Sequence, residues 1–128
     1  MGTLRYFAAN GLMVPGLRTL IMALGCFPAR MTPRWPSGLE YGLKQLSMGR
    51  TVFIFPEGRR TIRGHSRARG GVEVLAHSHQ AMVVPAHIEW ERRGRFGRRF
   101  RIGIGKPFDG THLTAQEILD RVYAVPVR

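Results

Sequence analysis

The sequence TVFIFPEG occupies residues 51–58 and joins two patterns with different structural meanings. Residues 51–55 form an unbroken run of β-branched and aromatic side chains, which is typical of a strand buried on both faces of a parallel sheet. Pro56, Glu57 and Gly58 follow directly, and proline with glycine indicates a turn. We therefore expect a buried strand that ends abruptly in a loop carrying one carboxylate.

Segments with helical spacing and short apolar segments alternate along the rest of the chain. Helical spacing is found over residues 15–25, 38–49, 71–79 and 114–122, and strand-like apolar runs are found over residues 4–9, 82–88 and 101–105. This alternation predicts an α/β fold with a mostly parallel central sheet flanked by helices. A length of 128 residues is enough for one domain, so we expect a single domain over residues 1–128.

The composition narrows the classes of protein and partner. Hydrophobic residues make up 44% of the chain, which favours a packed core over disorder. The net charge of +12 predicts attraction to polyanions such as nucleic acid, an anionic membrane or a phosphorylated substrate. The single cysteine, Cys26, forms no internal disulfide, which suits a reducing compartment. No apolar run approaches the ~20 residues that a membrane span needs, so we expect any membrane contact to be peripheral.

Glu57 is the only acidic residue between Tyr41 and Val72, where seven lysines and arginines lie. Its expected position, at the carboxyl end of a strand, is where open α/β sheets place their ligand sites. Gly58 would let the backbone approach a ligand closely, and neighbouring arginines can bind phosphate through two parallel hydrogen bonds. The alternative is a charged loop in which Glu57 only pairs with an arginine. These features alone leave both interpretations open.

The sequence VFIFPEGRRT at residues 52–61 resembles the Phe-Pro-Glu-Gly-Thr-Arg-Ser motif of the glycerolipid acyltransferases, the family of 1-acylglycerol-3-phosphate (lysophosphatidic acid) acyltransferases. The matching positions are Phe55, Pro56, Glu57, Gly58 and Arg60. Thr61 keeps a hydroxyl group, and Arg59 replaces the usual threonine. Residues 25–30, 43–50, 83–86 and 102–108 resemble further blocks of the family in the same order. The ordered set is more specific than the single motif.

The resemblance implies transfer of a fatty acyl group from a coenzyme A or acyl-carrier-protein thioester to a glycerophosphate hydroxyl in phospholipid synthesis. The thioester would be a co-substrate, and no bound cofactor or metal is expected. By position, Glu57, Gly58 and Arg60 would bind the phosphate head group, assisted by Arg30, and Pro85 would shape the site. Arg59 and Thr61 are candidate supporting residues. The expected partners are a glycerophospholipid, the anionic inner face of the cell membrane on its cytoplasmic side, and acyl-carrier protein.

The family's His-x-x-x-x-Asp motif, whose histidine deprotonates the attacking hydroxyl, does not occur in these 128 residues. His112 and Glu117 keep the spacing with a longer acid, but at the other end of the chain. We therefore assign no catalytic residue and expect this chain alone to be inactive or very slow, since loss of a positioned base costs ~10²–10⁴ in rate. Our hypothesis is that the catalytic segment lies upstream of Met1, so that the domain is partial: either truncated or assigned too late a start.

Six arginines lie between residues 92 and 101 and are interleaved with Phe96 and Phe100. This pattern suits anionic lipid headgroups, single-stranded nucleic acid or a solvated hairpin. The family resemblance favours the membrane, with Trp35 and Trp90 as interface anchors or core residues. Two other functions stay open: a basic nucleic-acid-binding module, which no recognised motif supports, and a degenerate protein that binds lipid headgroups without catalysis. We interpret His87, in an apolar strand, as a hydrogen-bonded core residue.

Overall fold

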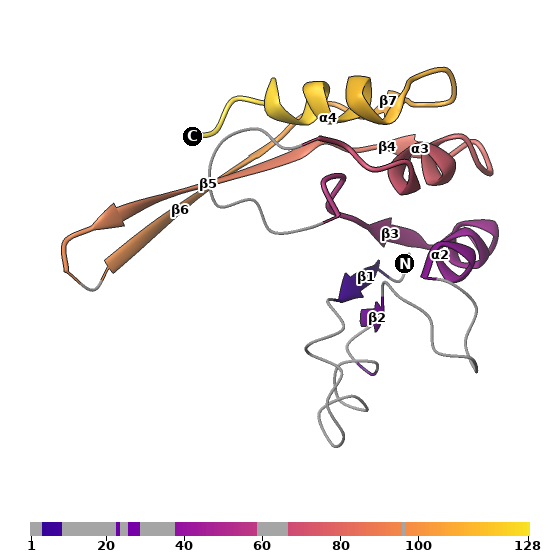
Figure 1. Cartoon of the computed structure of the whole chain (residues 1–128), viewed down its shortest axis with the longest axis horizontal. Coiled ribbons are helices and arrows are strands. Elements are labelled where there is room, and N and C mark those ends of the chain that lie inside the picture. Colours follow the sequence, from indigo (N-terminus) through magenta and orange to yellow (C-terminus); the bar gives the residue numbers. More distant parts are fainter. Residues whose placement is uncertain (1–3, 9–22, 24–25, 29–37, 59–66, 96) are drawn as a thin grey trace. The chain divides into compact units, whose positions relative to one another are not determined.

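The computed structural model describes residues 4–8, 23, 26–28, 38–58, 67–95 and 97–128 (Figure 1). The chain divides into two compact units, Met1–His65 and Ser66–Arg128. Apart from Ala23, the expected helix over residues 15–25 lies outside the described residues, as does Trp35.

A three-stranded parallel sheet forms the first unit. Its strands are β1 (Leu4–Ala8), β2 (Cys26–Pro28) and β3 (Thr51–Phe53), in the order β2-β1-β3. Leu4 is opposite Thr51 and Tyr6 is opposite both Phe53 and Cys26, so β1 is the central strand. The strand predicted from residues 4–9 is confirmed.

Helix α2 (Gly38–Ser47) precedes β3 and contacts it. Its buried residues are Gly38, Gly42 and Gln45, spaced at four and three residues on one face, whereas the leucines beside them are half-buried. The buried Gln45 amide oxygen accepts a hydrogen bond of 2.7 Å from the Arg50 guanidinium. The predicted stop at Gly49 is confirmed: its φ of 71° is in the left-handed region, which glycine adopts without strain.

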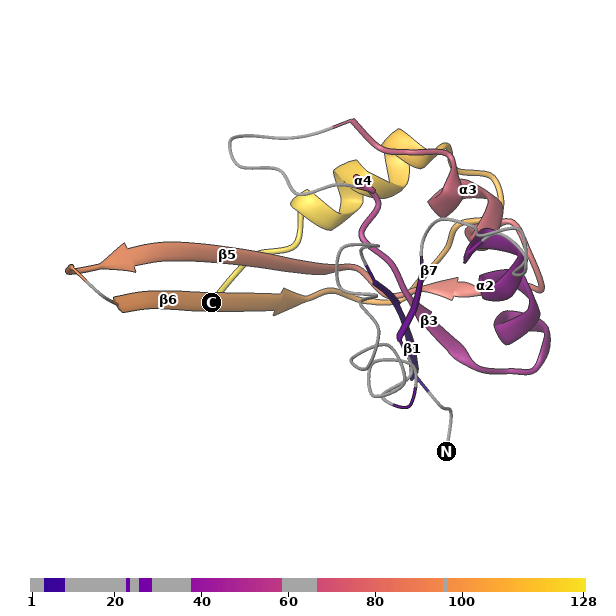
Figure 2. The ribbon, with the colours of Figure 1, turned by 60° about the horizontal axis from the view of Figure 1, so that its bottom comes forward.

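The described residues of the second unit form two helices and four strands. In chain order these are α3 (Gly71–Ala76), β4 (Met82–Val83), β5 (Ala86–Arg93), β6 (Gly97–Ile104), β7 (Phe108–Asp109) and α4 (Ala115–Tyr123). Strand β4 pairs antiparallel with β7, and β5 pairs antiparallel with β6. Figure 2 shows β5 and β6 running side by side as one long hairpin.

The expected mostly parallel central sheet is therefore met only by the three strands of the first unit. The prediction of a parallel sheet assumed that a helix connects each strand to the next. However, β5 and β6 are separated by only three residues. Parallel strands need a connection of a dozen or more residues, so a connection this short makes an antiparallel pair. The apolar run at 82–88 is also divided, because Pro85 has no N–H for a sheet and separates β4 from β5.

Helices α3 and α4 supply the core of the second unit. The buried apolar residues described there are Val72, Leu75, Ala76, Ala115, Ile118, Leu119 and Val125. The helical spacing predicted one apolar face with Val72, Leu75, Ala76 and His79 and another with Ile118, Leu119 and Val122. Burial confirms the apolar residues of both faces except Val122, which is half-buried. His79 was predicted wrongly: α3 ends at Ala76, and His79 is exposed beyond it with a φ of 51°. The Glu73 carboxylate also accepts a 2.8 Å hydrogen bond from the Ala115 backbone N–H, which joins α3 to the start of α4.

A capping box begins α4, as the Thr114-to-Glu117 spacing predicts. The Thr114 hydroxyl accepts a hydrogen bond from the Glu117 N–H at 3.2 Å, and the Glu117 carboxylate accepts one from the Thr114 N–H at 2.7 Å. Hydrogen bonds from the Thr114 backbone and side chain lower the pKa of Glu117 below its ordinary value of 4.5. The ionised form of Glu117 is therefore the one that stabilises the helix.

Glu117→Gln should remove a pH-dependent part of the stability. A carboxyl group whose pKa is lower in the folded state stabilises the fold above its unfolded-state pKa and loses that effect as the pH falls through the folded pKa. Wild type should exceed Glu117→Gln in free energy of unfolding at neutral pH, and the difference should shrink below the ordinary pKa of 4.5. Urea unfolding at several pH values measures this. A difference that does not depend on pH would contradict it.

The chain after α4 packs against the base of the hairpin. A Cβ on Gly103 would collide with the Pro126 carbonyl oxygen and approach a Val125 methyl group at 3.0 Å, so the tail lies directly on this glycine. Gly103→Ala should lower the free energy of unfolding by about 1–3 kcal/mol, the usual cost of overpacking. Gly70→Ala is the matched control because a Cβ there meets nothing within 4 Å; its effect should stay within about 0.5 kcal/mol. Equal effects of the two variants in urea unfolding would contradict this packing.

Candidate functional site

The chain leaves β3 through a tight turn over residues 55–58. The Gly58 N–H donates a 3.0 Å hydrogen bond to the Phe55 carbonyl oxygen, which closes a four-residue turn. Proline at the second position and glycine at the fourth are favoured in the commonest type of β-turn. Gly58 has a φ of 64°, so the chain turns through the left-handed region. The expected turn at Pro56-Glu57-Gly58 is thus confirmed.

Strand β3 differs from the prediction of burial on both faces. It ends at Phe53 rather than Phe55, and Phe55 is 54% exposed. In the described sheet β3 pairs with β1 alone, so it has one neighbouring strand, whereas the prediction assumed a strand inside a covered sheet. The Phe55 ring instead packs edge-on against Phe53, with ring centroids 5.2 Å apart and planes at 88°.

Sequence reasoning did not assign a role to Phe55. Its carbonyl oxygen closes the turn and its ring contacts the last residue of β3, so it holds the position of Glu57 relative to the sheet. The spacing of proline and glycine after Phe55 was the available signal.

Glu57 and Gly58 are the two predicted site residues that the structure brings together. Glu57 is half-buried at the carboxyl end of β3 and Gly58 is exposed beside it. Arg30, Arg59, Arg60 and Thr61 lie outside the described residues. Pro85 belongs to the second unit, where it is buried and its carbonyl oxygen accepts a 2.9 Å hydrogen bond from the Gly105 N–H.

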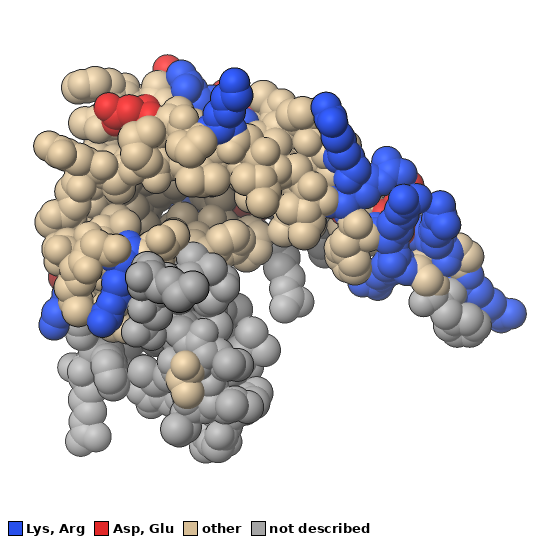
Figure 3. All heavy atoms as spheres, turned by 180° about the vertical axis from the view of Figure 1, so that it is seen from behind, with Lys and Arg blue, Asp and Glu red and all other residues tan. Residues whose placement is uncertain are grey.

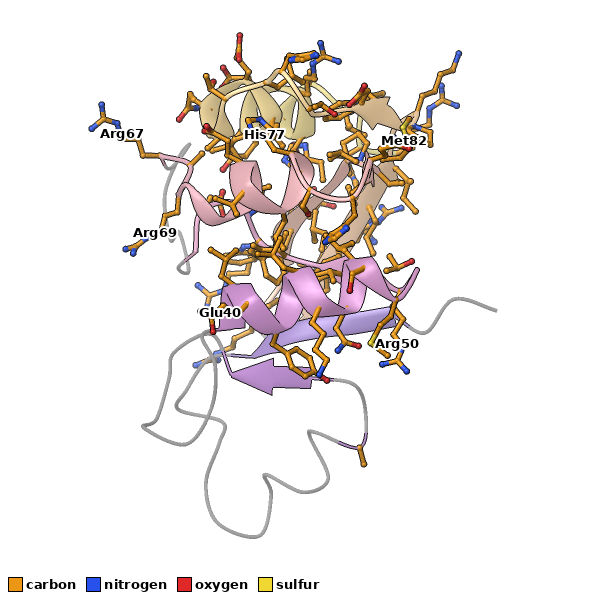
Figure 4. All side chains as sticks on the ribbon, turned by 90° about the vertical axis from the view of Figure 1, so that its right-hand side faces the viewer. Glu40, Arg50, Arg67, Arg69, His77 and Met82 are labelled. Atoms are coloured by element: carbon orange, nitrogen blue, oxygen red, sulfur yellow. The ribbon has the colours of Figure 1, made fainter. Side chains whose placement is uncertain are left out.

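Three other basic residues near this motif in sequence have separate settings. Arg50 is hydrogen-bonded to Gln45 at the end of α2. Arg67 and Arg69 are exposed in the second unit, and Figure 4 shows both side chains pointing away from its helices. The Gln116 side chain accepts a 3.2 Å hydrogen bond from the Ala68 N–H between them, which ties this segment to the first turn of α4.

Two of the described histidines, His87 and His77, have structural partners. His87 is half-buried, its Nδ1 lies 3.3 Å from the Val125 carbonyl oxygen, and its ring packs edge-on against Tyr123. This confirms its interpretation as a hydrogen-bonded residue of the fold. His77 Nε2 lies 2.8 Å from the Leu113 carbonyl oxygen. Glu117, considered as a partner of His112, takes part in the capping box of α4.

Among the described residues, no group of three or more histidine, cysteine, aspartate or glutamate side chains is placed to hold a metal ion. No helix in the described part of the chain has the length and apolar character to cross a bilayer.

A comparison with known families gives the context of the turn. The profile of the acyltransferase family matches residues 3–89, which is more than half of the chain and includes β1, α2, β3 and the turn. The chain belongs to the acyltransferase family. The family resemblance seen in the sequence is thereby confirmed, and the family supports acyl transfer as the general chemistry of this acyltransferase domain. No solved structure matches the chain.

Gly58→Ala should disturb the turn because an alanine in the left-handed region costs about 1–2 kcal/mol. We expect a loss of that size in the free energy of unfolding, measured with urea. Gly58→Asn should lose less, since asparagine tolerates this conformation better than alanine. Equal stability of wild type and Gly58→Ala would contradict the left-handed geometry at this position.

Proposed function

We propose that the turn at residues 55–58 and the arginines of its motif bind the glycerophosphate group of a lysophosphatidic acid-like acceptor. The observation that carries this proposal is the closed turn at residues 55–58, with Gly58 in the left-handed region, which follows β3 and leaves Glu57 beyond the carboxyl end of a parallel strand. Ligand sites in sheets of this kind lie at the carboxyl ends of the strands. The family match over residues 3–89 supports an acyl acceptor as the ligand.

The chemistry of the side chains indicates which of them suits the phosphate and which suits the glycerol hydroxyls. A guanidinium group has only donors and matches two phosphate oxygens, so Arg60 and Arg30 suit the phosphate, with Arg59 and Thr61 as further donors. An ionised carboxylate is only an acceptor, so Glu57 suits a glycerol hydroxyl.

The proposed reaction is that of a 1-acylglycerol-3-phosphate acyltransferase. The acceptor hydroxyl oxygen attacks the thioester carbonyl carbon of acyl-coenzyme A or acyl-carrier protein, the carbon–sulfur bond breaks, and the ester and free thiol form. The hydroxyl proton must be taken up and the thiolate protonated. Because these 128 residues contain no His-x-x-x-x-Asp, we propose that this chain alone turns over slowly or not at all.

The proposed setting is the inner face of the cell membrane, reached from the cytoplasm, where lysophospholipid substrates lie. The net charge of +12 supports attraction to an anionic surface. Acyl-carrier protein is a further proposed partner as one of the two acyl donors.

Binding measurements with two soluble probes test the division of roles. Arg60→Ala should weaken binding of both glycerol 3-phosphate and inorganic phosphate by at least about tenfold, because a hydrogen bond to a charged group contributes about 1.5–3 kcal/mol. Glu57→Gln should weaken glycerol 3-phosphate binding but not phosphate binding. Titration calorimetry on the full chain measures both.

Arg128→Ala is the matched control, since it removes one positive charge from an exposed position outside the motif. It should leave both affinities within about twofold of wild type, as expected for an exposed charge that salt screens. If Arg60→Ala and Arg128→Ala behave alike, the phosphate site is wrong. If Glu57→Gln lowers both affinities equally, the assignment of the glycerol hydroxyl to Glu57 is wrong.

A further inference from the structure

The β5–β6 hairpin has two chemically different faces. Side chains alternate between faces along a strand, so the facing pairs Ile88–Ile102, Trp90–Phe100 and Arg92–Arg98 share one face. We call the first four of these residues the hairpin apolar face. The opposite face carries the pairs His87–Gly103, Glu89–Arg101 and Glu91–Arg99.

The opposite face is occupied by partners within the unit. At its base, Val125 and Pro126 pack on Gly103. The Val125 carbonyl oxygen also lies 3.3 Å from Nδ1 of His87. Further along, the Glu91 carboxylate lies 3.2 Å from the Arg101 guanidinium and 4.0 Å from that of Arg93. Both glutamates of the hairpin are on this face, where arginines offset their charge.

The hairpin apolar face is exposed to an unusual degree. Trp90 is 56% exposed, Phe100 61% and Ile102 58%, and Ile88 is also exposed. Soluble proteins rarely expose contiguous apolar side chains of this size without a binding role. Apolar side chains occupy every second position at residues 86–90 and 100–104. This alternation is the sequence signal for the face, and the run of arginines over residues 92–101 does not reveal it.

The charge on this same face is entirely positive. Arg92 and Arg98 are direct cross-strand partners, and like charges in that position destabilise a hairpin unless an anion lies between them. The Arg98 guanidinium also lies over the Trp90 ring, 5.1 Å from its centroid. Figure 3 shows lysine and arginine side chains gathered over the outer part of the hairpin. The face thus joins apolar side chains to an unbalanced cationic end.

We propose that the hairpin apolar face, with Arg92 and Arg98, is a docking surface for a bilayer containing anionic phospholipid. Trp90 and Phe100 lie at the headgroup boundary, where aromatic side chains are favoured, and the two arginines bind lipid phosphates. The choice of a lipid surface among polyanions rests on the proposed function. The two isoleucines support it independently, because bases stack on aromatic rings and gain little from aliphatic side chains.

Vesicle binding by the full chain tests this proposal. Trp90→Ser/Phe100→Ser should lower partition into phosphatidylcholine vesicles that contain phosphatidylglycerol by about tenfold, since partition follows buried apolar area. Glu89→Ser/Arg101→Ser is the matched control, because it changes a facing pair on the opposite face without altering net charge; it should have less than about a twofold effect. Circular dichroism confirms that both variants fold. Equal loss of binding by the two variants would overturn the proposal.

Charge and exposure provide two further readouts. Wild type should bind vesicles of phosphatidylcholine alone more weakly than anionic ones, and added salt should reduce the difference. In a Trp35→Phe variant, where Trp90 is the remaining tryptophan, anionic vesicles should shift its fluorescence to the blue and protect it from a soluble quencher. Protection of Trp90 without vesicles would show that the protein itself covers this face and would overturn the proposal.

Two controls separate this surface from the other interpretations. Arg60→Ala should keep vesicle binding, and Trp90→Ser/Phe100→Ser should keep glycerol 3-phosphate binding, so either site can fail alone. Salt-sensitive binding of an unstructured oligouridylate, with no partition into anionic vesicles, would overturn the membrane surface and favour a nucleic-acid-binding module.

Discussion

The hydrogen bond from the Gly58 N–H to the Phe55 carbonyl oxygen is the local constraint on which the candidate site depends. It closes the turn at residues 55–58 that follows β3, and Gly58, the last residue of this turn, is in the left-handed region with a φ of 64°. Because β3 pairs in parallel with β1, the turn begins two residues after a strand that is fixed in a sheet. The turn gives the Glu57 backbone a defined position beyond the strand's carboxyl end. The acyl-acceptor proposal starts from this geometry.

Local patterns predicted local structure well. The turn at Pro56-Glu57-Gly58, the left-handed Gly49 that follows α2 and the capping box at Thr114 each depend on residues close in sequence, and each is present. The pairing of strands depends on the length of the connections, which alternation alone does not give. The short link between β5 and β6 therefore produced an antiparallel hairpin where a parallel sheet was expected.

The candidate site was predicted unevenly for the same reason. The motif predicted a turn that carries Glu57 and Gly58, and both residues lie in the closed turn at residues 55–58. The prediction that Phe55 is buried was wrong, because the hydrophobicity of a strand does not reveal how many strands lie beside it or what covers its faces. The hairpin's two faces were visible only after register was known: a count of arginines over residues 92–101 mixes side chains that point in opposite directions.

The start of α4 has a consequence for how this basic protein selects anions. Helix N-termini commonly attract phosphate through their free N–H groups and dipole. Here two carboxylates already occupy that position, since Glu73 accepts from the Ala115 N–H and Glu117 accepts from the Thr114 N–H. The negative charge of these side chains repels further anions. The N-terminus of α4 is therefore not expected to bind phosphate in competition with the proposed site, although the chain has a net charge of +12.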